Sequence, residues 1–146
     1  MELVAPVGPV YQAGTLSANP VGMVAGLATL RKLKKTNPYA AMEKRVEQMG
    51  REMEATAAKK GIPFKAQSEA SIFWGVFHDS GTSTVRSLSE FPKIHKERYQ
   101  KLFHGLLNRG FYLAPSAFEV GFISTAHTDS DLERFLKAFG ETVGKV

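Results

Sequence analysis

The chain has 146 residues with no cysteine, 43% hydrophobic and 23% charged residues, and a formal net charge of +5. This length and composition are typical of one globular domain with its own core, and the lack of cysteine excludes disulfides and thiolate metal sites. The histidines show no metal-ligand spacing, and no positively charged region precedes an apolar stretch at the N-terminus. We therefore expect no metal site, no signal peptide and a cytoplasmic protein.

The first predicted helix follows a loop. Residues 1–20 are interrupted by glycine and proline and show no lasting period of 2 or 3.6 residues, so we expect a loop there. Asn19 followed by Pro20 predicts a helix start with the asparagine as N-cap, and apolar residues then recur on one side to about residue 36. The apolar run at 21–33 contains two basic residues and is shorter than the roughly 18 residues of a membrane span, so we expect no membrane partner.

The second predicted helix lies in the basic part of the chain. Asn37 followed by Pro38 repeats the start signal, and a stop is expected at Gly61. The apolar residues at helical spacing are Met42, Val46, Met49 and Met53. Between Arg31 and Lys60, nine basic residues accompany four acidic ones, which accounts for the whole net charge. Interleaved glutamates and the lack of aromatic platforms favour a solvated helix face and no nucleic-acid partner, with a phosphate-tracking stripe as the minor alternative.

The remaining chain alternates strands and helices. Strands are predicted at 62–64, 71–77, 111–113 and 122–125, a mobile surface loop at 79–92, and helices at 94–108 and after Thr128. The apolar stripe of the first of these helices is Tyr99, Leu102, Phe103, Leu106 and Leu107, with Gly110 as the stop. Thr128 and Asp131 form an acidic variant of a capping box. The last helix is expected to bury Leu132, Phe135, Leu136, Phe139 and Val143. This order indicates an α+β fold, with helices packed on a small, mostly antiparallel sheet.

Two stretches carry residues suited to chemistry. In the first, GPVYQAGTLSANP from Gly8 to Pro20, Gly14 permits close backbone approach and Thr15 offers a hydroxyl beside a helix start. That combination suits a phosphate, although it is also common in simple turns. The second, YLAPSAFEVGFISTAH, contains Glu119, and without further information the favoured interpretation of this residue is a surface loop residue. We expect His127, just before the helix cap, to be a structural hydrogen-bonding group.

These two stretches resemble the class III aminotransferases and, within them, the glutamate-1-semialdehyde aminomutases. The first is similar to GPVYQAGTLSGNP and the second to YLAPSAFEAGFxSxAH, and together they span essentially the whole chain. The resemblance implies the C-terminal portion of a fold-type I transferase dependent on pyridoxal 5'-phosphate (PLP). It implies a loop segment of the large PLP domain and dimer interface at 1–20, a connecting helix at 21–36 and the C-terminal small domain at 37–146.

The resemblance also implies an activity and a role for particular residues. The intact enzyme would be a homodimeric isomerase of porphyrin biosynthesis that converts the small molecule glutamate-1-semialdehyde to 5-aminolevulinate. Gly14 and Thr15 would contact the phosphate of the PLP across the dimer, Tyr11 would lie in the substrate region, and Glu119 would be a catalytic residue. In the family the catalytic lysine lies upstream of the matched region, so this chain alone is expected to be inactive.

One departure and two alternatives accompany the resemblance. Ala18 replaces the family's glycine, which costs about 1 kcal/mol if that position needs a positive φ. Another class III aminotransferase, such as an amino-acid or omega-amino transaminase, is the nearest alternative, and Glu119 in its Ala-Pro-Ser-Ala-Phe-Glu setting favours the aminomutase. A stand-alone, non-catalytic dimerisation or binding module is the alternative from another class.

Overall fold

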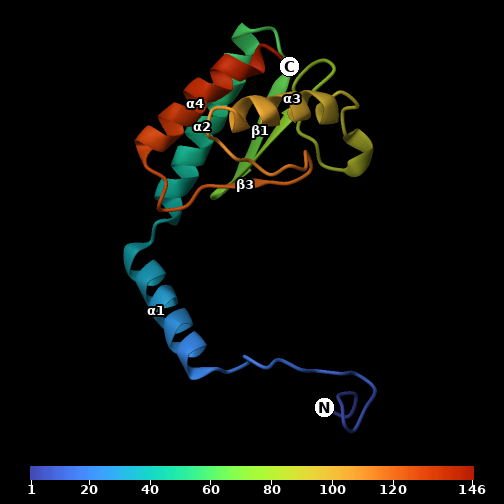
Figure 1. Cartoon of the computed structure of the whole chain (residues 1–146), viewed down its shortest axis with the longest axis vertical. Coiled ribbons are helices and arrows are strands. Elements are labelled where there is room, and N and C mark those ends of the chain that lie inside the picture. The colour runs from blue at the N-terminus through green and yellow to red at the C-terminus, as the bar shows by residue number, and fades with distance from the viewer. The chain divides into compact units, whose positions relative to one another are not determined.

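We describe a computed structural model of all 146 residues (Figure 1). The backbone divides into two compact units, Met1–Asn37 and Pro38–Val146. The helices are α1 (Pro20–Thr36), α2 (Tyr39–Lys59), α3 (His95–Leu107) and α4 (Asp129–Val143), with a short 3-10 turn at Leu88–Glu90. The strands are β1 (Phe64–Glu69), β2 (Ile72–Phe77) and β3 (Gly121–Phe122). None of the helices combines the length and apolar character needed to cross a membrane.

The N-cap predicted for α1 is confirmed. The side-chain oxygen of Asn19 accepts hydrogen bonds from the backbone N–H groups of Val21 and Gly22, at 3.0 and 3.2 Å. No residue of α1 is buried. The helix ends at Asn37, which adopts a left-handed conformation with φ of 39° and donates its N–H to the carbonyl of Leu33 at 2.8 Å.

The same asparagine corrects the prediction for the start of α2. Asn37 was expected to cap α2, but the capping position is taken by Pro38, and no side chain caps this helix. An N-cap residue needs an extended backbone, whereas Asn37 is left-handed because it terminates α1. The asparagine–proline pair therefore marks a helix end here and a helix start at Asn19.

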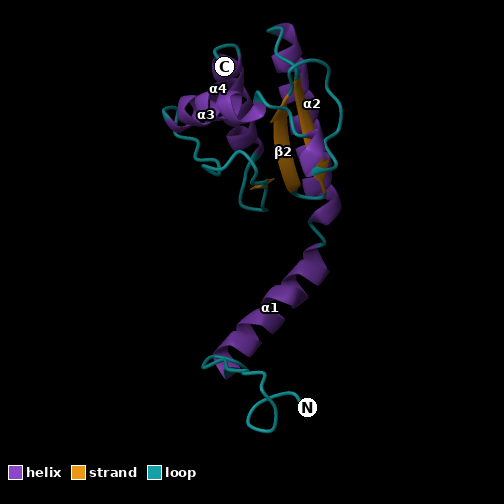
Figure 2. Ribbon diagram, turned by 90° about the vertical axis from the view of Figure 1, so that its right-hand side faces the viewer, coloured by secondary structure: helices purple, strands orange, loops and turns teal.

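The core lies entirely within Pro38–Val146. The predicted stripe of α2 is confirmed, since Met42, Val46, Met49 and Met53 are all buried. The largest fully buried side chains are Phe77, Phe139, Met49, Leu106 and His95. In this unit α2 contacts β1 and α4, and α3 contacts α4 and β2 (Figure 2). The packed helices therefore bury one face of the sheet.

The sheet is small and antiparallel, which confirms the predicted α+β fold. β1 and β2 form a hairpin from Phe64 opposite Phe77 to Glu69 opposite Ile72, and β3 pairs with β2 only at Ile72 and Phe73. The strand predicted at 62–64 in fact begins at Phe64 and continues through polar residues to Glu69. Polar side chains are tolerated in β1 because its second half is partly exposed.

Two further strand predictions need correction. Residues 111–113 form no strand, because they lack a backbone partner in the sheet, and the strand predicted at 122–125 is reduced to Gly121–Phe122. In α3, Tyr99, Leu102 and Leu106 are buried and Phe103 is partly buried, but Leu107 is 41% exposed. Leu106 and Leu107 are one residue apart, about 100° around the helix, so the core-facing side accommodates only Leu106.

The segment at 79–92 is a surface loop, as predicted, but it is fixed to the sheet at two points. The side-chain amide of Gln67 accepts from the N–H of Val85 at 2.8 Å and donates to its carbonyl at 3.1 Å. The ring of Phe91 packs on Trp74, with 5.3 Å between the ring centroids. This segment therefore covers part of the sheet at Gln67 and Trp74.

Candidate functional site

The first candidate site is the turn that contains Gly14 and Thr15, in the unit Met1–Asn37. The N–H of Ser17 donates to the carbonyl of Gly14 at 2.9 Å, which closes the turn. Tyr11, Gly14 and Thr15 are all exposed. The backbone N–H groups of Gly14 and Thr15 and the hydroxyl of Thr15 donate to no atom of the chain, so three donors are free for an oxyanion.

The start of α1 contributes less to this site than the sequence pattern suggests. Pro20 has no N–H, Val21 and Gly22 donate to the side chain of Asn19, and Met23 donates to its carbonyl at 2.9 Å. All the backbone donors of the first helical turn are thus occupied. A phosphate in this region would be bound by the turn at Gly14 and Thr15, while the helix adds only the field of its dipole.

Ala18 lies between this turn and the helix, and its φ is 57°. Ala18 stands where the similar stretch GPVYQAGTLSGNP has glycine, and this position does adopt the left-handed conformation. Alanine pays a steric cost there of about 1 kcal/mol relative to glycine. The next residue, Asn19, caps α1 in this chain.

The second candidate site is the segment from Tyr112 to Glu119, in the unit Pro38–Val146. Its backbone belongs to no strand, and three buried or half-buried side chains donate hydrogen bonds to it. The hydroxyl of Tyr99 donates to the carbonyl of Ala114 at 2.6 Å. The indole N–H of Trp74 and Nε2 of His95 both bond the carbonyl of Ala117, at 3.1 and 2.9 Å. The segment is therefore held by side chains of β2 and α3.

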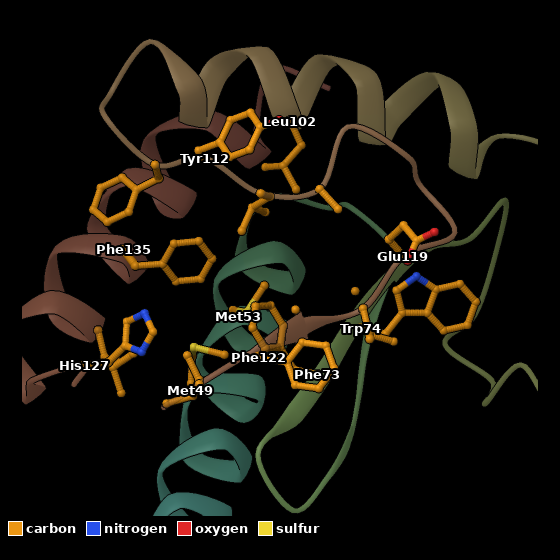
Figure 3. Close-up of a pocket in the computed structure, with 18 of the residues that line it drawn as sticks. Met49, Met53, Phe73, Trp74, Leu102, Tyr112, Glu119, Phe122, His127 and Phe135 are labelled. Atoms are coloured by element: carbon orange, nitrogen blue, oxygen red, sulfur yellow. The ribbon is translucent and has the colours of Figure 1, made fainter. Parts of the chain in front are cut away.

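Glu119, the last residue of this segment, is exposed and lines a cavity of about 350 Å³ at its mouth. Figure 3 shows Glu119 and Trp74 together at one end of the cavity and His127 at the other. Apolar side chains line the space between them, among them Met49, Met53, Phe73, Leu102, Phe122 and Phe135. A mostly apolar cavity that is also lined by the carboxylates of Glu119 and Asp131 is the type of concave site that binds small molecules.

His127 is a structural group, as predicted. Its Nδ1 accepts a hydrogen bond from the N–H of Ser124 at 3.0 Å, and its carbonyl accepts one from Arg45 at 3.1 Å. Arg45 also forms an ion pair with Asp129 at the start of α4. The capping box is confirmed, because Thr128 and Asp131 bond each other reciprocally, and the hydrogen bonds from Thr128 lower the pKa of the Asp131 carboxyl.

The hydrogen-bond donors of Gly14 and Thr15 fit the phosphate of a PLP cofactor, but no lysine that could bind the cofactor covalently lines the cavity. The free N–H and hydroxyl groups at Gly14 and Thr15 match phosphate oxygens, which accept hydrogen bonds. The residues around the cavity include no lysine, the side chain to which PLP is bound in its enzymes. No group of three or more His, Asp or Glu side chains could hold a metal ion.

Sequence reasoning missed the residues that fix the second site. Trp74 and His95 were not singled out, and Tyr99 was identified only as part of an apolar stripe. One signal was present: His95 lies four residues before Tyr99 and so shares the buried face of α3. A histidine on the apolar face of a helix is buried with its hydrogen-bonding groups satisfied, and here it bonds Phe77 and Ala117.

The comparison with solved structures defines the class. A β-phenylalanine aminotransferase from Variovorax paradoxus matches 94% of this chain with 31% of its own, at a TM-score of 0.77 and 28% identity. An omega-transaminase from Sphaerobacter thermophilus matches 93% of this chain with 31% of its own, at a TM-score of 0.67 and 25% identity. A transaminase with PLP bound has the same fold at a TM-score of 0.72 and 23% identity. The chain thus has the α+β fold of the C-terminal part of PLP-dependent transaminases.

The sequence comparison gives the particular relatives. The chain is 48% identical over 130 residues to a glutamate-1-semialdehyde 2,1-aminomutase of Leptospira biflexa serovar Patoc, which is 88% of this chain and 30% of that protein. It is 43% identical over 134 residues to the aminomutase of the same name from Bdellovibrio bacteriovorus, at 92% of this chain and 31% of that protein. The chain is therefore homologous to a C-terminal portion of the glutamate-1-semialdehyde 2,1-aminomutases and spans about 30% of their length. No family model matches it.

Proposed function

We propose that this chain is the C-terminal part of a PLP-dependent glutamate-1-semialdehyde 2,1-aminomutase. The observation that carries the proposal is the 48% identity to the Leptospira biflexa aminomutase over 130 residues. The reaction moves the amino group of glutamate-1-semialdehyde to the adjacent carbon and gives 5-aminolevulinate for porphyrin biosynthesis, so no atoms are gained or lost. The bound cofactor supplies the electron sink that stabilises negative charge at the reacting carbon.

We further propose that the chain is divided as in an aminomutase. Residues 1–20 belong with the large PLP domain and dimer interface, residues 21–36 form the connecting helix and residues 37–146 form the small domain. The backbone division after Asn37 supports this, and so does the exposure of apolar residues along α1, which another surface would cover. The exposed residues are Val21, Met23, Val24, Leu27 and Leu30. The working enzyme would be a cytoplasmic homodimer.

Each candidate residue then has a proposed role. Gly14 and Thr15 bind the phosphate of the PLP held by the partner subunit, because their free N–H and hydroxyl groups suit phosphate oxygens. The exposed Tyr11 contributes to the substrate region next to that phosphate. Glu119 reaches the substrate from the small domain and orients its amino group through a charge-assisted hydrogen bond.

A chimera tests the proposal. This chain replaces the matching part of the Leptospira biflexa aminomutase, and conversion of glutamate-1-semialdehyde to 5-aminolevulinate is measured without an added amino acceptor. We expect an active chimera, and no activity from this chain alone. Glu119→Gln should lower kcat/KM about tenfold or more, since one charge-assisted hydrogen bond contributes about 1.5–3 kcal/mol. Thr15→Ala should raise the PLP concentration needed for half-maximal activity.

The outcomes separate the candidate functions. An active chimera that tolerates Glu119→Gln and Thr15→Ala would remove both residues from the site. Turnover that appears only with an amino acceptor would favour a class III aminotransferase, the second candidate, which the similarity to the β-phenylalanine aminotransferase supports. A folded, dimeric but inactive chimera would favour the non-catalytic module.

A further inference from the structure

The segment that carries Glu119 has no strand partner, yet its carbonyl groups are bonded. A buried or half-buried carbonyl must find a donor, and in this segment the donors are side chains. Tyr99 donates to Ala114 at 2.6 Å, and Trp74 and His95 share the carbonyl of Ala117 at 3.1 and 2.9 Å. The two carbonyls that accept from side chains lie within five residues of Glu119. The three donors thus determine where the backbone of this carboxylate runs.

His95 joins β2 to this segment through both of its ring nitrogens. Its Nδ1 accepts a hydrogen bond from the N–H of Phe77 at 3.1 Å, so the ring proton lies on Nε2, which donates to Ala117. The side chain is fully buried, and burial lowers its pKa, which keeps the ring neutral. Only the neutral ring can accept at one nitrogen and donate at the other.

Aromatic packing completes the support next to Glu119. The ring of Phe118 lies 4.8 Å from that of Phe91, and Phe91 lies 5.0 Å from His95, measured between centroids. Within the segment, Ser116 accepts from the N–H of Phe118 through Oγ at 3.2 Å and from the N–H of Glu119 through its carbonyl at 3.3 Å. Exchange at the amides of Phe118 and Glu119 therefore reports whether these hydrogen bonds within the segment are formed.

We infer that Trp74, His95 and Tyr99 are positioning residues for Glu119, which hold its segment at the mouth of the cavity through the carbonyls of Ala114 and Ala117. This inference deepens the proposed aminomutase function and rests on Glu119 acting in it. His95 does not line the cavity, whereas Trp74 and Tyr99 do, and all three side chains are bonded to the backbone of the segment that carries the carboxylate. Glu119 is exposed and makes no ion pair, so within the chain only that backbone determines where the residue lies.

The first test uses the 146-residue chain in solution and measures amide hydrogen exchange at Phe118 and Glu119 by NMR. His95→Leu removes the donor and the acceptor and should speed exchange about tenfold, since each hydrogen bond contributes roughly 0.5–1.5 kcal/mol. His95→Gln should exchange slowly, as in the unchanged chain, because a glutamine amide offers one donor and one acceptor. The nitrogen chemical shifts of His95 should show the Nε2–H tautomer.

Two further variants keep the test decisive if His95→Leu does not fold. Trp74→Phe and Tyr99→Phe each remove one donor to the segment and should also speed exchange at Phe118 and Glu119. Tyr39→Phe is the matched control, because the Tyr39 hydroxyl is exposed and bonds nothing in the chain. Equal exchange rates in all these variants, or the Nδ1–H tautomer of His95, would overturn the positioning role.

The chimera supplies the functional readout. His95→Leu should lower kcat with little change in KM, and His95→Gln should restore it. In a Glu119→Gln background, His95→Leu should cause little further loss, because a residue that acts through Glu119 is coupled to it. Additive losses would mean that His95 is merely structural. If the unchanged chimera is inactive, the proposed function fails, while the exchange rates still decide whether the segment is held by these donors.

Discussion

Three residues other than glycine adopt a positive φ: Ala18, Asn37 and Ala70. Asparagine tolerates this conformation, but alanine gains nothing there and loses about 1 kcal/mol to the contact of its Cβ with the backbone. Ala70, with φ of 50°, lies in the two-residue turn that connects Glu69 of β1 to Ile72 of β2. A fold that keeps alanine at this position carries strain that one substitution can relieve.

We therefore expect Ala70→Gly to raise the free energy of unfolding by about 0.5–1 kcal/mol, as the relief of strain exceeds the added freedom of the unfolded chain. The matched control is Ala55→Gly, at an exposed position within α2, which should lower it by about 1 kcal/mol. Urea unfolding of the three proteins measures both changes. If the two substitutions destabilise equally, the left-handed strain at Ala70 is absent.

Two buried histidines make stability depend on pH. Burial lowers the pKa of both His78 and His95 from the ordinary value of 6.5. At His78 the nearby Asp79 opposes this shift. At His95 the hydrogen bond to Ala117 opposes it, while His78 adds to it. Arg98 also faces this region, since it donates to the carbonyl of His78 at 3.0 Å. Both rings are therefore neutral in the folded chain at a pH where they are charged in the unfolded one.

Because the unfolded chain binds more protons, the free energy of unfolding should be constant above about pH 7 and fall as the pH drops below 6.5. The slope is at most about 1.4 kcal/mol per pH unit for each histidine. Asp131 and Glu97 have lowered pKa values and titrate below this window. Urea unfolding at pH 7.5 and 5.5 should show a smaller loss in His78→Gln and in His95→Gln. A loss of equal size in both variants and the unchanged chain would contradict the assignment.

At the scale of elements, α3 and α4 meet at a glycine. A Cβ placed on Gly105 would lie 2.2 Å from the Cγ2 of Thr142, a contact too short for any real packing. Thr142 is buried, and its hydroxyl is fixed by a bond to the carbonyl of Ala138 at 2.8 Å. The two helices can approach this closely only because position 105 has no side chain.

Gly105→Ala should therefore lower the free energy of unfolding by about 1–3 kcal/mol, although alanine favours a helix over glycine by about 1 kcal/mol. Adding Thr142→Ser removes the clashing methyl group, keeps the hydroxyl and should recover part of the loss. Chemical unfolding of both single variants and the double variant gives the coupling between the positions. Additive effects would show that the contact does not limit the approach of the helices.

The sequence predicted the helices better than the strands, for physical reasons. α2, α3 and α4 each bury a stripe with a helical period and are bounded by clear signals: Gly61 after α2, Gly110 after α3 and the Thr128 capping box at the start of α4. β1 escaped the pattern because it is polar beyond Phe64, and its place is decided by pairing with β2. The composition of residues 111–113 is typical of a strand, but whether a strand forms depends on tertiary packing, which here provides no neighbouring strand to pair with.

In the candidate sites, too, the sequence predicts some features and the packing determines the others. The motifs located Gly14, Thr15 and Glu119 because glycine, hydroxyl and carboxylate groups are visible in a sequence. The supports of Glu119 were not predictable, since Trp74 lies 43 residues from Ala117 and His95 lies 22 residues from it. Only the packing of β2 and α3 brings these donors to one carbonyl. The motif likewise does not show that Asn19 occupies the donors at the start of α1.

For the molecule as a whole, burial is divided unevenly between the two units. Every buried core residue lies between Met42 and Val143, and α1 has none. The candidate residues are divided differently: Tyr11, Gly14 and Thr15 lie before Asn37, and Glu119 lies after it. Stability and the proposed phosphate contact therefore belong to different parts of the chain and can be changed separately.

A chain that begins at Pro38 should consequently unfold with a free energy within about 0.5 kcal/mol of the full chain, since removal of surface groups has little effect on stability. The control is a chain that begins at Glu47, which also loses Met42 and Val46 from the core and should be less stable by about 2 kcal/mol or more. Urea unfolding followed by far-UV circular dichroism measures all three. A large loss in the chain from Pro38 would show that residues 1–37 stabilise the small domain. Retained stability would leave them free to serve another surface, as the proposed dimer contact requires.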